Sequence, residues 1–288
     1  MSTRVLIVDG SPAAAQDALV ALGAGRSGET YADALKSQMP AGAAGLDCFI
    51  LAATEGEVLP QGMQLSDFHG IAWTGSPLSA YDPHPAVTAQ IDLARAAFQS
   101  GVPCFGSCWG LQVMAVALGG RVHLNPNGYE IGIARQIRLN ETGRAHELYV
   151  GKPACFDAVC THQDEVCELP SGAQVLAGNG ISAIQAAVIE DDGRSFWGVQ
   201  YHPEFGLGQV SAIMRRRAGR LVRDGFARTE ADIESLGQDL MALHRDPARR
   251  DIAWRYGIGS DILDPQCHRR EFANWLSAKV VPRSAAAL

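Results

Sequence analysis

Cys108 is the residue best suited to carry chemistry, because it lies in a Gly-x-Cys-x-Gly turn between an apolar strand, Val102 to Phe105, and an apolar helix, Leu111 to Leu118. Gly106 and Gly110 remove the side chains that would clash where strand and helix approach, so the residue between them can hold a strained backbone. The N-terminus of a helix also favours the thiolate, the reactive form of cysteine. The pattern predicts a nucleophile, and the alternative is a small buried cysteine in a tight turn.

A second segment supplies a base. The residues from Phe196 to Tyr201 are predicted to form a strand, which delivers His202-Pro203-Glu204 at its end. Positions 202 and 204 of an extended chain point to the same side, so Glu204 can hold the His202 ring while the other ring nitrogen faces the thiol. A histidine alone would more often be structural, but the cysteine turn and the His-x-Glu strand end together predict a Cys-His-Glu triad.

The two motifs, Gly106-Ser107-Cys108-Trp109-Gly110-Leu111-Gln112 and Gln200-Tyr201-His202-Pro203-Glu204, resemble those of the class I, or triad, glutamine amidotransferase family. Glutaminase domains of that family carry G-x-C-x-G-x-Q and H-P-E, and the resemblance covers roughly residues 4 to 207. It implies that Cys108 is the nucleophile, His202 the base and Glu204 the residue that orients the base.

The resemblance also implies the rest of the site. The backbone N–H groups of Gly75 and Trp109 are expected to form the oxyanion hole, although a Gly-Ser-Pro turn alone would be interpreted as a connector. Asp164 is expected to pair with the α-ammonium group of the substrate, with a solvated loop acid as the alternative. His162 belongs to a His-x-Asp element that the family places in the substrate wall and outside the triad. The residues expected to bind substrate are Gln112, Asp164 and Ser76.

Three functions remain open on these residues. The first is a glutaminase that passes ammonia to a synthetase or acceptor subunit on another chain, since no P-loop is present in the 288 residues. The second is a free-standing γ-glutamyl peptidase, because the string from His162 to Val166 resembles both GMP-synthetase-type glutaminases and γ-glutamyl peptidases. The third, a non-catalytic partner-binding domain, is weakened by the intact triad. The substrate is glutamine or a γ-glutamyl compound, and no metal or organic cofactor is called for.

Composition indicates an ordinary globular protein, with 47% hydrophobic and 19% charged residues and no apolar run long enough to span a membrane. Seven cysteines without a C-x-x-C pair argue against a disulfide framework or a zinc site, and we expect a cytoplasmic protein. Residues 1–208 hold 10 Lys and Arg against 21 Asp and Glu, whereas residues 209–288 hold 14 against 10. The acidity of the first part argues against nucleic acid as a partner.

The order of predicted elements indicates the fold. Apolar strands over Arg4 to Val8, Asp47 to Ala52 and Phe68 to Thr74 alternate with helices, which predicts a doubly wound, mostly parallel α/β sheet. The family resemblance implies that this sheet is of flavodoxin-like type. The strands predicted over Ile131 to Leu139 and Cys155 to Cys160 have no long helix between them. We therefore expect them to form a subsidiary antiparallel sheet.

Beyond the strands the spacing is helical, and we predict a glutaminase domain over residues 1–227 followed by a helical extension over 228–288. Thr229 and Asp232 form a possible capping box. The runs Arg215-Arg216-Arg217 and Arg249-Arg250 are interpreted as solvated helix faces, and the alternative is docking against the acidic main domain or a second subunit. The extension either packs on its own domain or binds another subunit, including a second copy of the chain; the second is favoured because it has aromatic residues typical of interfaces, namely Trp254, Tyr256, Phe272 and Trp275.

Overall fold

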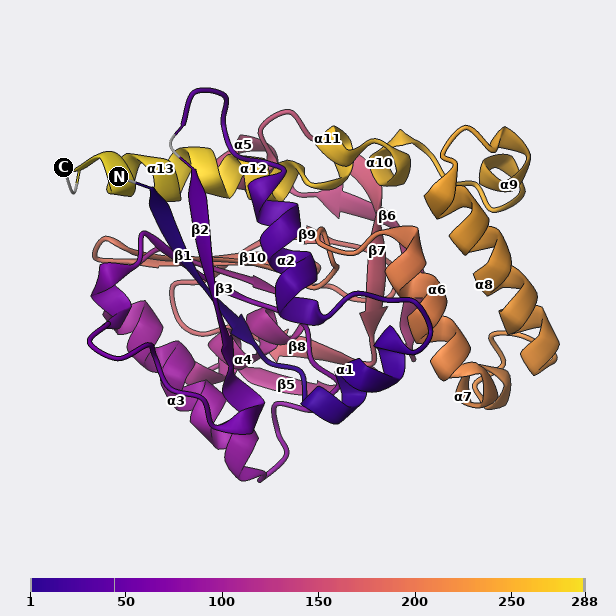
Figure 1. Cartoon of the computed structure of the whole chain (residues 1–288), viewed down its shortest axis with the longest axis horizontal. Helices are drawn as coiled ribbons and strands as arrows, with labels where there is room; N and C mark the ends of the chain where they lie inside the picture. The colour runs from indigo at the N-terminus through magenta and orange to yellow at the C-terminus, as the bar shows by residue number, and fades with distance from the viewer. Residues whose placement is uncertain (1, 44, 287–288) are drawn as a thin grey trace.

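The computed structural model describes residues 2–43 and 45–286, and Figure 1 shows a central sheet with helices on both faces. The strands are β1 (Thr3–Asp9), β2 (Leu46–Ala52), β3 (Gly70–Trp73), β4 (Cys104–Ser107), β5 (Arg121–Leu124), β6 (Glu130–Leu139), β7 (Cys155–His162), β8 (Asp164–Glu168), β9 (Gln174–Gly178), β10 (Ala186–Asp191) and β11 (Arg194–Val199). The main helices are α1 (Ala13–Val20), α2 (Ser27–Lys36), α3 (Pro85–Gln99), α4 (Trp109–Ala117), α6 (Leu207–Arg216), α7 (Ala218–Arg223) and α8 (Glu230–Arg245).

Shorter helical segments complete the chain. They are α5 (Glu141–Ala145), α9 (Arg250–Arg255), α10 (Ser260–Leu263), α11 (Pro265–His268), α12 (Arg270–Trp275) and α13 (Val281–Ala286), with the single turns η1 (Ala53–Glu55), η2 (Leu65–Asp67), η3 (Glu147–Tyr149) and η4 (Leu276–Val280). The capping box predicted for α8 is confirmed, because the Thr229 and Asp232 side chains each accept a hydrogen bond from the other residue's backbone N–H.

Nine strands form one sheet in the order β2-β1-β3-β4-β11-β10-β9-β6-β7. The first five are parallel, since β1 pairs in parallel with β2 and β3, and β4 pairs in parallel with β3 and β11. The remaining pairs are antiparallel. The predicted α/β fold is therefore confirmed.

One detail differs from the prediction. The strands over 131–139 and 155–160 are antiparallel as expected, but β6 and β7 continue the main sheet. The separate antiparallel sheet consists of β5 and β8. Strands β9 and β10 connect β6 and β7 to the parallel strands. β10 pairs with β11 and with β9, and β9 in turn pairs with β6.

Each face of the parallel half is covered by its own apolar core. Alternate residues of the strands point to opposite faces, so Val5 and Ile7 of β1 belong to one cluster and Leu6 and Val8 to the other. Helices α3 and α4 cover the second face. The first face is covered by α2 and by the C-terminal helix α12, which lies across the sheet in Figure 1.

The C-terminal segment forms part of this core. Phe272, Trp275, Leu276 and Val280 are completely buried, and they pack in the same cluster as residues of β1, β3 and β4. The expectation that Phe272 and Trp275 serve as anchors for another subunit is therefore wrong, because both side chains fill the chain's own core. Of the four aromatic residues named for this role only Trp254 is strongly exposed, at 74%. A homo-oligomer, and a domain boundary near residue 228, stay predictions.

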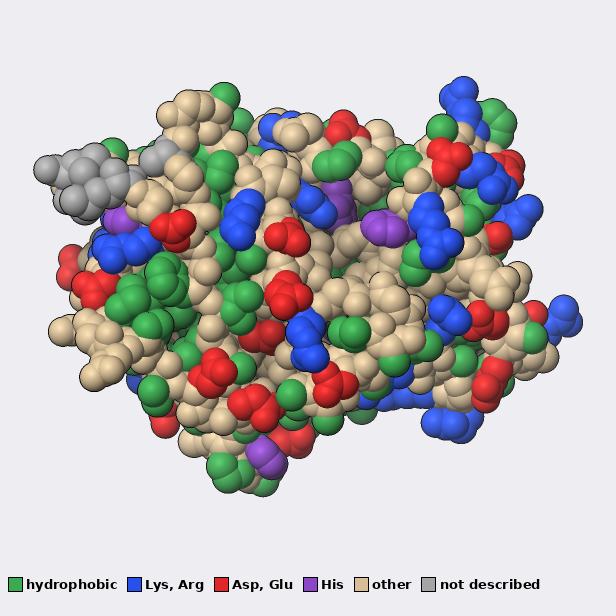
Figure 2. Space-filling view, viewed as in Figure 1, with side chains coloured by type: hydrophobic (Ala, Val, Ile, Leu, Met, Phe, Trp, Pro, Cys, Tyr) green, Lys and Arg blue, Asp and Glu red, His purple; other side chains and the backbone are tan. Residues whose placement is uncertain are grey.

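Side-chain charge is unevenly distributed over the surface. Lysine and arginine side chains gather at the end of the molecule formed by α7, α8 and α9, in agreement with the positive charge of the last 80 residues (Figure 2). None of the helices in residues 2–43 and 45–286 is both long and apolar enough to cross a membrane.

Candidate functional site

The proposed catalytic residues meet at the carboxyl ends of three adjacent parallel strands. Gly75 follows β3, Cys108 follows β4 and His202 follows β11, and β4 pairs with both other strands. Open α/β sheets bind their ligands at this edge. Sheet order therefore brings together residues that lie far apart in the sequence.

The turn at Cys108 has the strained geometry that the glycines predict. Cys108 has φ 50° and ψ −98°, a left-handed conformation that L residues rarely adopt, and its N–H donates to the carbonyl oxygen of Val199 at 2.7 Å. A Cβ on Gly106 would lie 2.6 Å from the carbonyl carbon of Gly110, and a Cβ on Gly110 would lie 2.6 Å from Cβ of Trp73. Any side chain at Gly106 or Gly110 would therefore overlap the neighbouring backbone or Trp73. Helix α4 begins at Trp109, directly after Cys108.

His202 is held by its neighbours in the His-Pro-Glu turn. Its Nδ1 lies 2.7 Å from Oε1 of Glu204, and both side chains are almost fully buried. Because a carboxylate accepts, Nδ1 carries the proton in this pair. The ring of Phe205 stacks on the imidazole with centroids 4.1 Å apart and an angle of 6°. Nε2 is buried without a hydrogen bond to any described residue, and His202 and Cys108 line the same cavity.

The electrostatics of this pair favour a charged imidazole. Burial alone would lower the pKa of His202, but the negative charge of Glu204 and the neighbouring Cys108 raise that pKa from 6.5 to about 10. An imidazolium beside the thiol stabilises a thiolate. The other two buried cysteines near the sheet, Cys104 and Cys160, have thiols whose pKa is raised by burial. They are consequently poor nucleophiles.

Two backbone N–H groups are available at this edge. In the described residues, the N–H groups of Gly75 and Trp109 make no hydrogen bond, and Trp109 is the first residue of α4, where no intrahelical partner exists. A Cβ on Gly75 would lie 2.6 Å from Cε1 of His202, so the glycine is packed against the imidazole ring. Gly75 and Cys108 line the same cavity, and Trp109 directly follows Cys108, so the predicted oxyanion hole stays a prediction.

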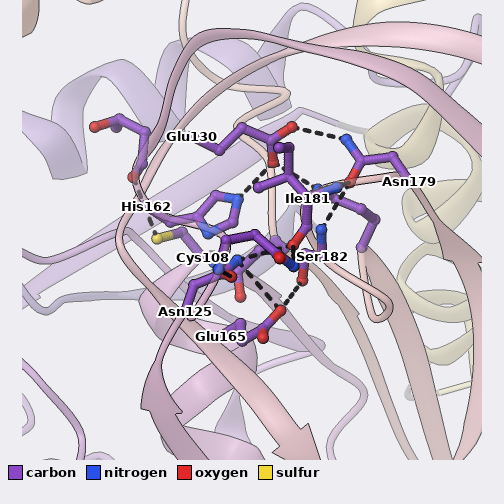
Figure 3. A network of polar contacts seen from close by, with 12 residues as sticks. Cys108, Asn125, Glu130, His162, Glu165, Asn179, Ile181 and Ser182 are labelled. Carbon is purple, nitrogen blue, oxygen red and sulfur yellow. Dashed lines mark hydrogen bonds and ion pairs between the residues drawn. The ribbon is translucent and has the colours of Figure 1, made fainter. Parts of the chain in front are cut away.

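His162 is engaged on both ring nitrogens, in contrast to His202. Nε2 lies 2.8 Å from Oε2 of Glu130 and Nδ1 lies 3.1 Å from the carbonyl oxygen of Asp164. Glu130 also accepts from Asn179 and Gln185 at 2.7 Å each. Burial would raise the pKa of this carboxyl, but the hydrogen bond from His162 and, to a lesser extent, those from the two side-chain amides lower it. Figure 3 shows this network beside Cys108. A ring with both nitrogens in use is a wall of the site and a poor candidate for the base.

The network continues around Glu165. Its carboxylate accepts from Ser182 at 2.7 Å and from Asn125 at 3.3 Å (Figure 3). Nε2 of His123 lies 3.2 Å from the other carboxylate oxygen. Most of these partners are buried, so the loops that carry them are held at fixed positions under the site.

Two cavities flank Cys108. The first, of about 70 Å³, is lined by Cys108, His202 and Gly75 together with the apolar side chains of Leu19, Phe205 and Ile213. The second, of about 360 Å³, is lined by Cys108 and by polar groups. All three residues expected to bind substrate border the second cavity, namely Gln112, Asp164 and Ser76.

The side chains of two of these residues already have partners. Gln112 donates to the Asp164 carbonyl oxygen at 3.0 Å and to Gln200 at 3.3 Å. The Asp164 carboxylate accepts from Ser79 at 2.6 Å and from Tyr81 at 3.1 Å. Asp164 is only 4% exposed, so the alternative of a solvated loop acid is wrong. Its pairing with a substrate ammonium group stays a prediction.

Sequence reasoning missed several residues of the site. Arg216 and Arg217 line both cavities, so they are more than a solvated helix face. Arg215 fits the solvated interpretation better, since it pairs with Glu234 at 2.7 Å at the surface. The spacing of the arginine run could not separate these roles, because the turn from α6 into α7 decides which side chains point to the cavities. Phe205 could have been found, since it follows His-Pro-Glu directly.

A metal site is not evident in the described part of the chain, because no group of three or more His, Cys, Asp and Glu side chains lies close enough to hold an ion.

The fold and this site define a class of protein. Residues 44–218, more than half of the chain, match the family model described as glutamine amidotransferase class-I, and the chain belongs to that family. A curated relative from Pseudomonas sp., a gamma-glutamyl-L-1-hydroxyisopropylamide hydrolase, is 34% identical over 223 residues, which cover 76% of this chain and 75% of the relative. A GMP synthase (glutamine-hydrolyzing) from Leifsonia xyli is 31% identical over 205 residues, covering 65% of this chain but only 39% of that protein.

Solved structures agree with the fold. A glutamine amidotransferase from Thermotoga maritima superimposes with a TM-score of 0.60 at 19% identity, over 88% of this chain and 99% of that chain. A glutamine amidotransferase from Methylobacillus flagellatus gives a TM-score of 0.60 at 21% identity, over 100% of this chain and 96% of that chain. At these identities the likeness establishes the fold. The expected family is confirmed, and the homologues are hydrolases of glutamine or γ-glutamyl amides.

Proposed function

We propose that this chain hydrolyses the γ-amide bond of a γ-glutamyl compound through a Cys108-His202-Glu204 triad. The observation that carries the proposal is the state of His202: Nδ1 is bound to Glu204, whereas Nε2 is free and borders the cavity that contains the Cys108 thiol. A base oriented on one nitrogen and free on the other is what nucleophilic catalysis by a thiol requires.

The mechanism follows from the positions of these groups. The Cys108 thiolate attacks the γ-carbonyl carbon, and the N–H groups of Gly75 and Trp109 receive the negative charge that develops on the oxygen, each worth about 3 kcal/mol. His202 then protonates the leaving amine, the C–N bond breaks, and a γ-glutamyl thioester remains on Cys108. A water molecule gives one proton to His202 while its oxygen attacks the thioester carbonyl carbon. The C–S bond breaks, the new γ-carboxyl group loses its proton to solvent, and glutamate leaves a Cys108 thiolate beside a protonated His202.

The cavities suggest how the substrate lies. The amine must leave towards His202, which protonates it, and His202 lines only the smaller cavity. The γ-glutamyl half then occupies the larger, polar cavity. Arg216 and Arg217, at the border of both, are suited to a carboxylate of the substrate.

The apolar side chains beside His202 favour a leaving amine that carries a small organic group. This agrees with the Pseudomonas relative, whose name gives a γ-glutamyl amide of a substituted amine as its substrate. We therefore place a γ-glutamyl hydrolase first.

A glutaminase that supplies ammonia to an acceptor on another chain is the second candidate. The similarity to the glutamine-hydrolysing part of GMP synthase supports it, and the same triad would serve. The two candidates differ only in the leaving group and in coupling to a partner.

The experiment compares glutamine with γ-glutamyl-ethylamide and γ-glutamyl dipeptides as substrates of the purified chain, by measuring glutamate release. Rapid turnover of the substituted amides with slow turnover of glutamine supports the hydrolase, and the reverse supports the glutaminase. Cys108→Ala should abolish release from every substrate while the melting temperature stays within a few degrees. Persistent turnover by this variant would contradict the triad.

A further inference from the structure

Four residues of the C-terminal segment, His268 to Glu271, lie directly behind the turn that carries His202. His268 is 6% exposed, and its Nε2 lies 2.7 Å from the carbonyl oxygen of Phe205. Because a carbonyl only accepts, Nε2 is the donor. Burial and the nearby charge of Lys152 lower the pKa of His268 to about 3, so the ring is neutral. One C-terminal side chain therefore fixes the backbone of the residue that stacks on the His202 ring.

Phe205 transmits this contact to the imidazole. Its ring lies parallel to that of His202 at 4.1 Å, and its N–H donates to the His202 carbonyl oxygen at 3.2 Å. Gly75 touches the imidazole at Cε1, closely enough that a single methyl group would overlap it. The position of the His202 ring thus depends on where Phe205 is held.

Glu271 fixes the other side of the turn. Its Oε1 accepts from the hydroxyl of Tyr201, the residue before His202, at 2.6 Å, and from Nζ of Lys152 at 2.6 Å. The Lys152 and Glu271 side chains are 1% and 0% exposed. A second hydroxyl, that of Tyr149, lies 2.9 Å from the Tyr201 oxygen and donates to it, since the Tyr201 proton points to Glu271.

A buried ion pair of this kind contributes little net stability, because the cost of desolvation offsets the attraction between the charges. The best-attested role of such pairs is to fix how the segments that they join are placed against each other. Arg269 lies between His268 and Glu271 in the sequence. Its side chain is partly buried and donates to the Ser37 hydroxyl at 3.0 Å. Burial lowers the pKa of the Arg269 guanidinium, whereas the negative charge of Glu204 raises it.

We propose that His268 and Glu271 are positioning residues of the catalytic histidine: by holding Phe205 and Tyr201 on either side of His202, the C-terminal segment sets the place of the imidazole relative to the Cys108 thiol. The proposal rests on the proposed function of His202. On this proposal the C-terminal extension acts on the active site of its own chain. A segment that only packed against the core would not.

The test compares three substitutions in the same region. His268→Ala removes the hydrogen bond to Phe205, and His268→Gln can restore a donor. Asn274→Ala is the control, because Asn274 donates to the carbonyl oxygens of Leu148 and Val150 at 2.8 and 3.0 Å and makes no hydrogen bond to a described residue of the His202 turn. All are assayed with γ-glutamyl-ethylamide and glutamine well below their melting temperatures.

We expect His268→Ala to lower kcat about 10- to 100-fold with KM changed less than about twofold, as a misplacement of the base near 1 Å would do. Alkylation of Cys108 by iodoacetamide at pH 7 should slow as well, since the displaced imidazolium stabilises the thiolate less. His268→Gln should recover part of both losses. Asn274→Ala should lower the melting temperature and leave kcat and alkylation unchanged.

Similar behaviour of His268→Ala and Asn274→Ala, with kcat retained, would show a structural role only and overturn the proposal. If His268→Ala does not fold, the double variant Lys152→Met/Glu271→Gln removes the buried charges together, and wild-type kcat in that folded variant would overturn the proposal equally. A wild-type chain that hydrolyses neither substrate and has an unreactive Cys108 would instead refute the proposed function itself.

Discussion

Gly75→Ala is the substitution whose effect on the site can be worked out from one distance. The new Cβ would lie 2.6 Å from Cε1 of His202, whereas two carbon atoms in contact are normally about 3.5 Å apart. The imidazole must therefore move by about 1 Å, and the parallel ring of Phe205 blocks one face of it. A displacement of that size costs about 100-fold in rate, which corresponds to about 2.7 kcal/mol in the activation free energy.

The assay is glutamate release from glutamine and from γ-glutamyl-ethylamide, with kcat and KM determined separately and the melting temperature recorded. Gly180→Ala is the matched control, because no heavy atom lies within 4 Å of the Cβ that it would add and its φ is not positive. We expect Gly180→Ala to keep kcat/KM within about twofold. A folded Gly75→Ala protein with wild-type kcat/KM would refute the placement of His202 against this glycine.

Three further predictions follow from the same site. Glu204→Gln removes the charge that raises the pKa of His202 to about 10, so the alkaline limb of the kcat/KM profile should move to lower pH; an unmoved limb would show that Glu204 does not control the imidazole. His162→Ala should raise KM and change kcat only a few-fold, since both ring nitrogens are occupied by Glu130 and a carbonyl; a collapse of kcat would make His162 the base. Trp275→Ala should lower the free energy of unfolding by about 3–5 kcal/mol in denaturant titrations, and a loss below about 1 kcal/mol would contradict its place in the core.

The parts of the site that could be predicted are those encoded within a few residues. The glycines around Cys108 and the spacing of His202 and Glu204 are local patterns, and the strand that precedes each motif delivers it to the same edge of a parallel sheet. Both motifs could therefore be predicted from the local sequence, without knowledge of how distant elements pack.

The remainder depends on packing that a linear pattern does not encode. Leu19 reaches the smaller cavity because α1 packs against α6, and the helical spacing of α1 does not show this. The membership of β6 in the main sheet is decided by its pairing with β9, far along the chain. Trp275 looked like an interface residue because an apolar helix face has the same composition whether it covers another chain or its own sheet.

The location of α12 and η4 has a consequence for biosynthesis. The face of the sheet under β1, β3 and β4 is covered by Phe272, Trp275 and Val280, which leave the ribosome long after the strands that they cover. A nascent chain therefore carries the cysteine elbow and the His-Pro-Glu turn above an uncovered apolar surface, a state that invites aggregation and engages chaperones. We therefore expect the Cys108 thiol and the His202 imidazole to be aligned only after the residues up to Val280 have been synthesised.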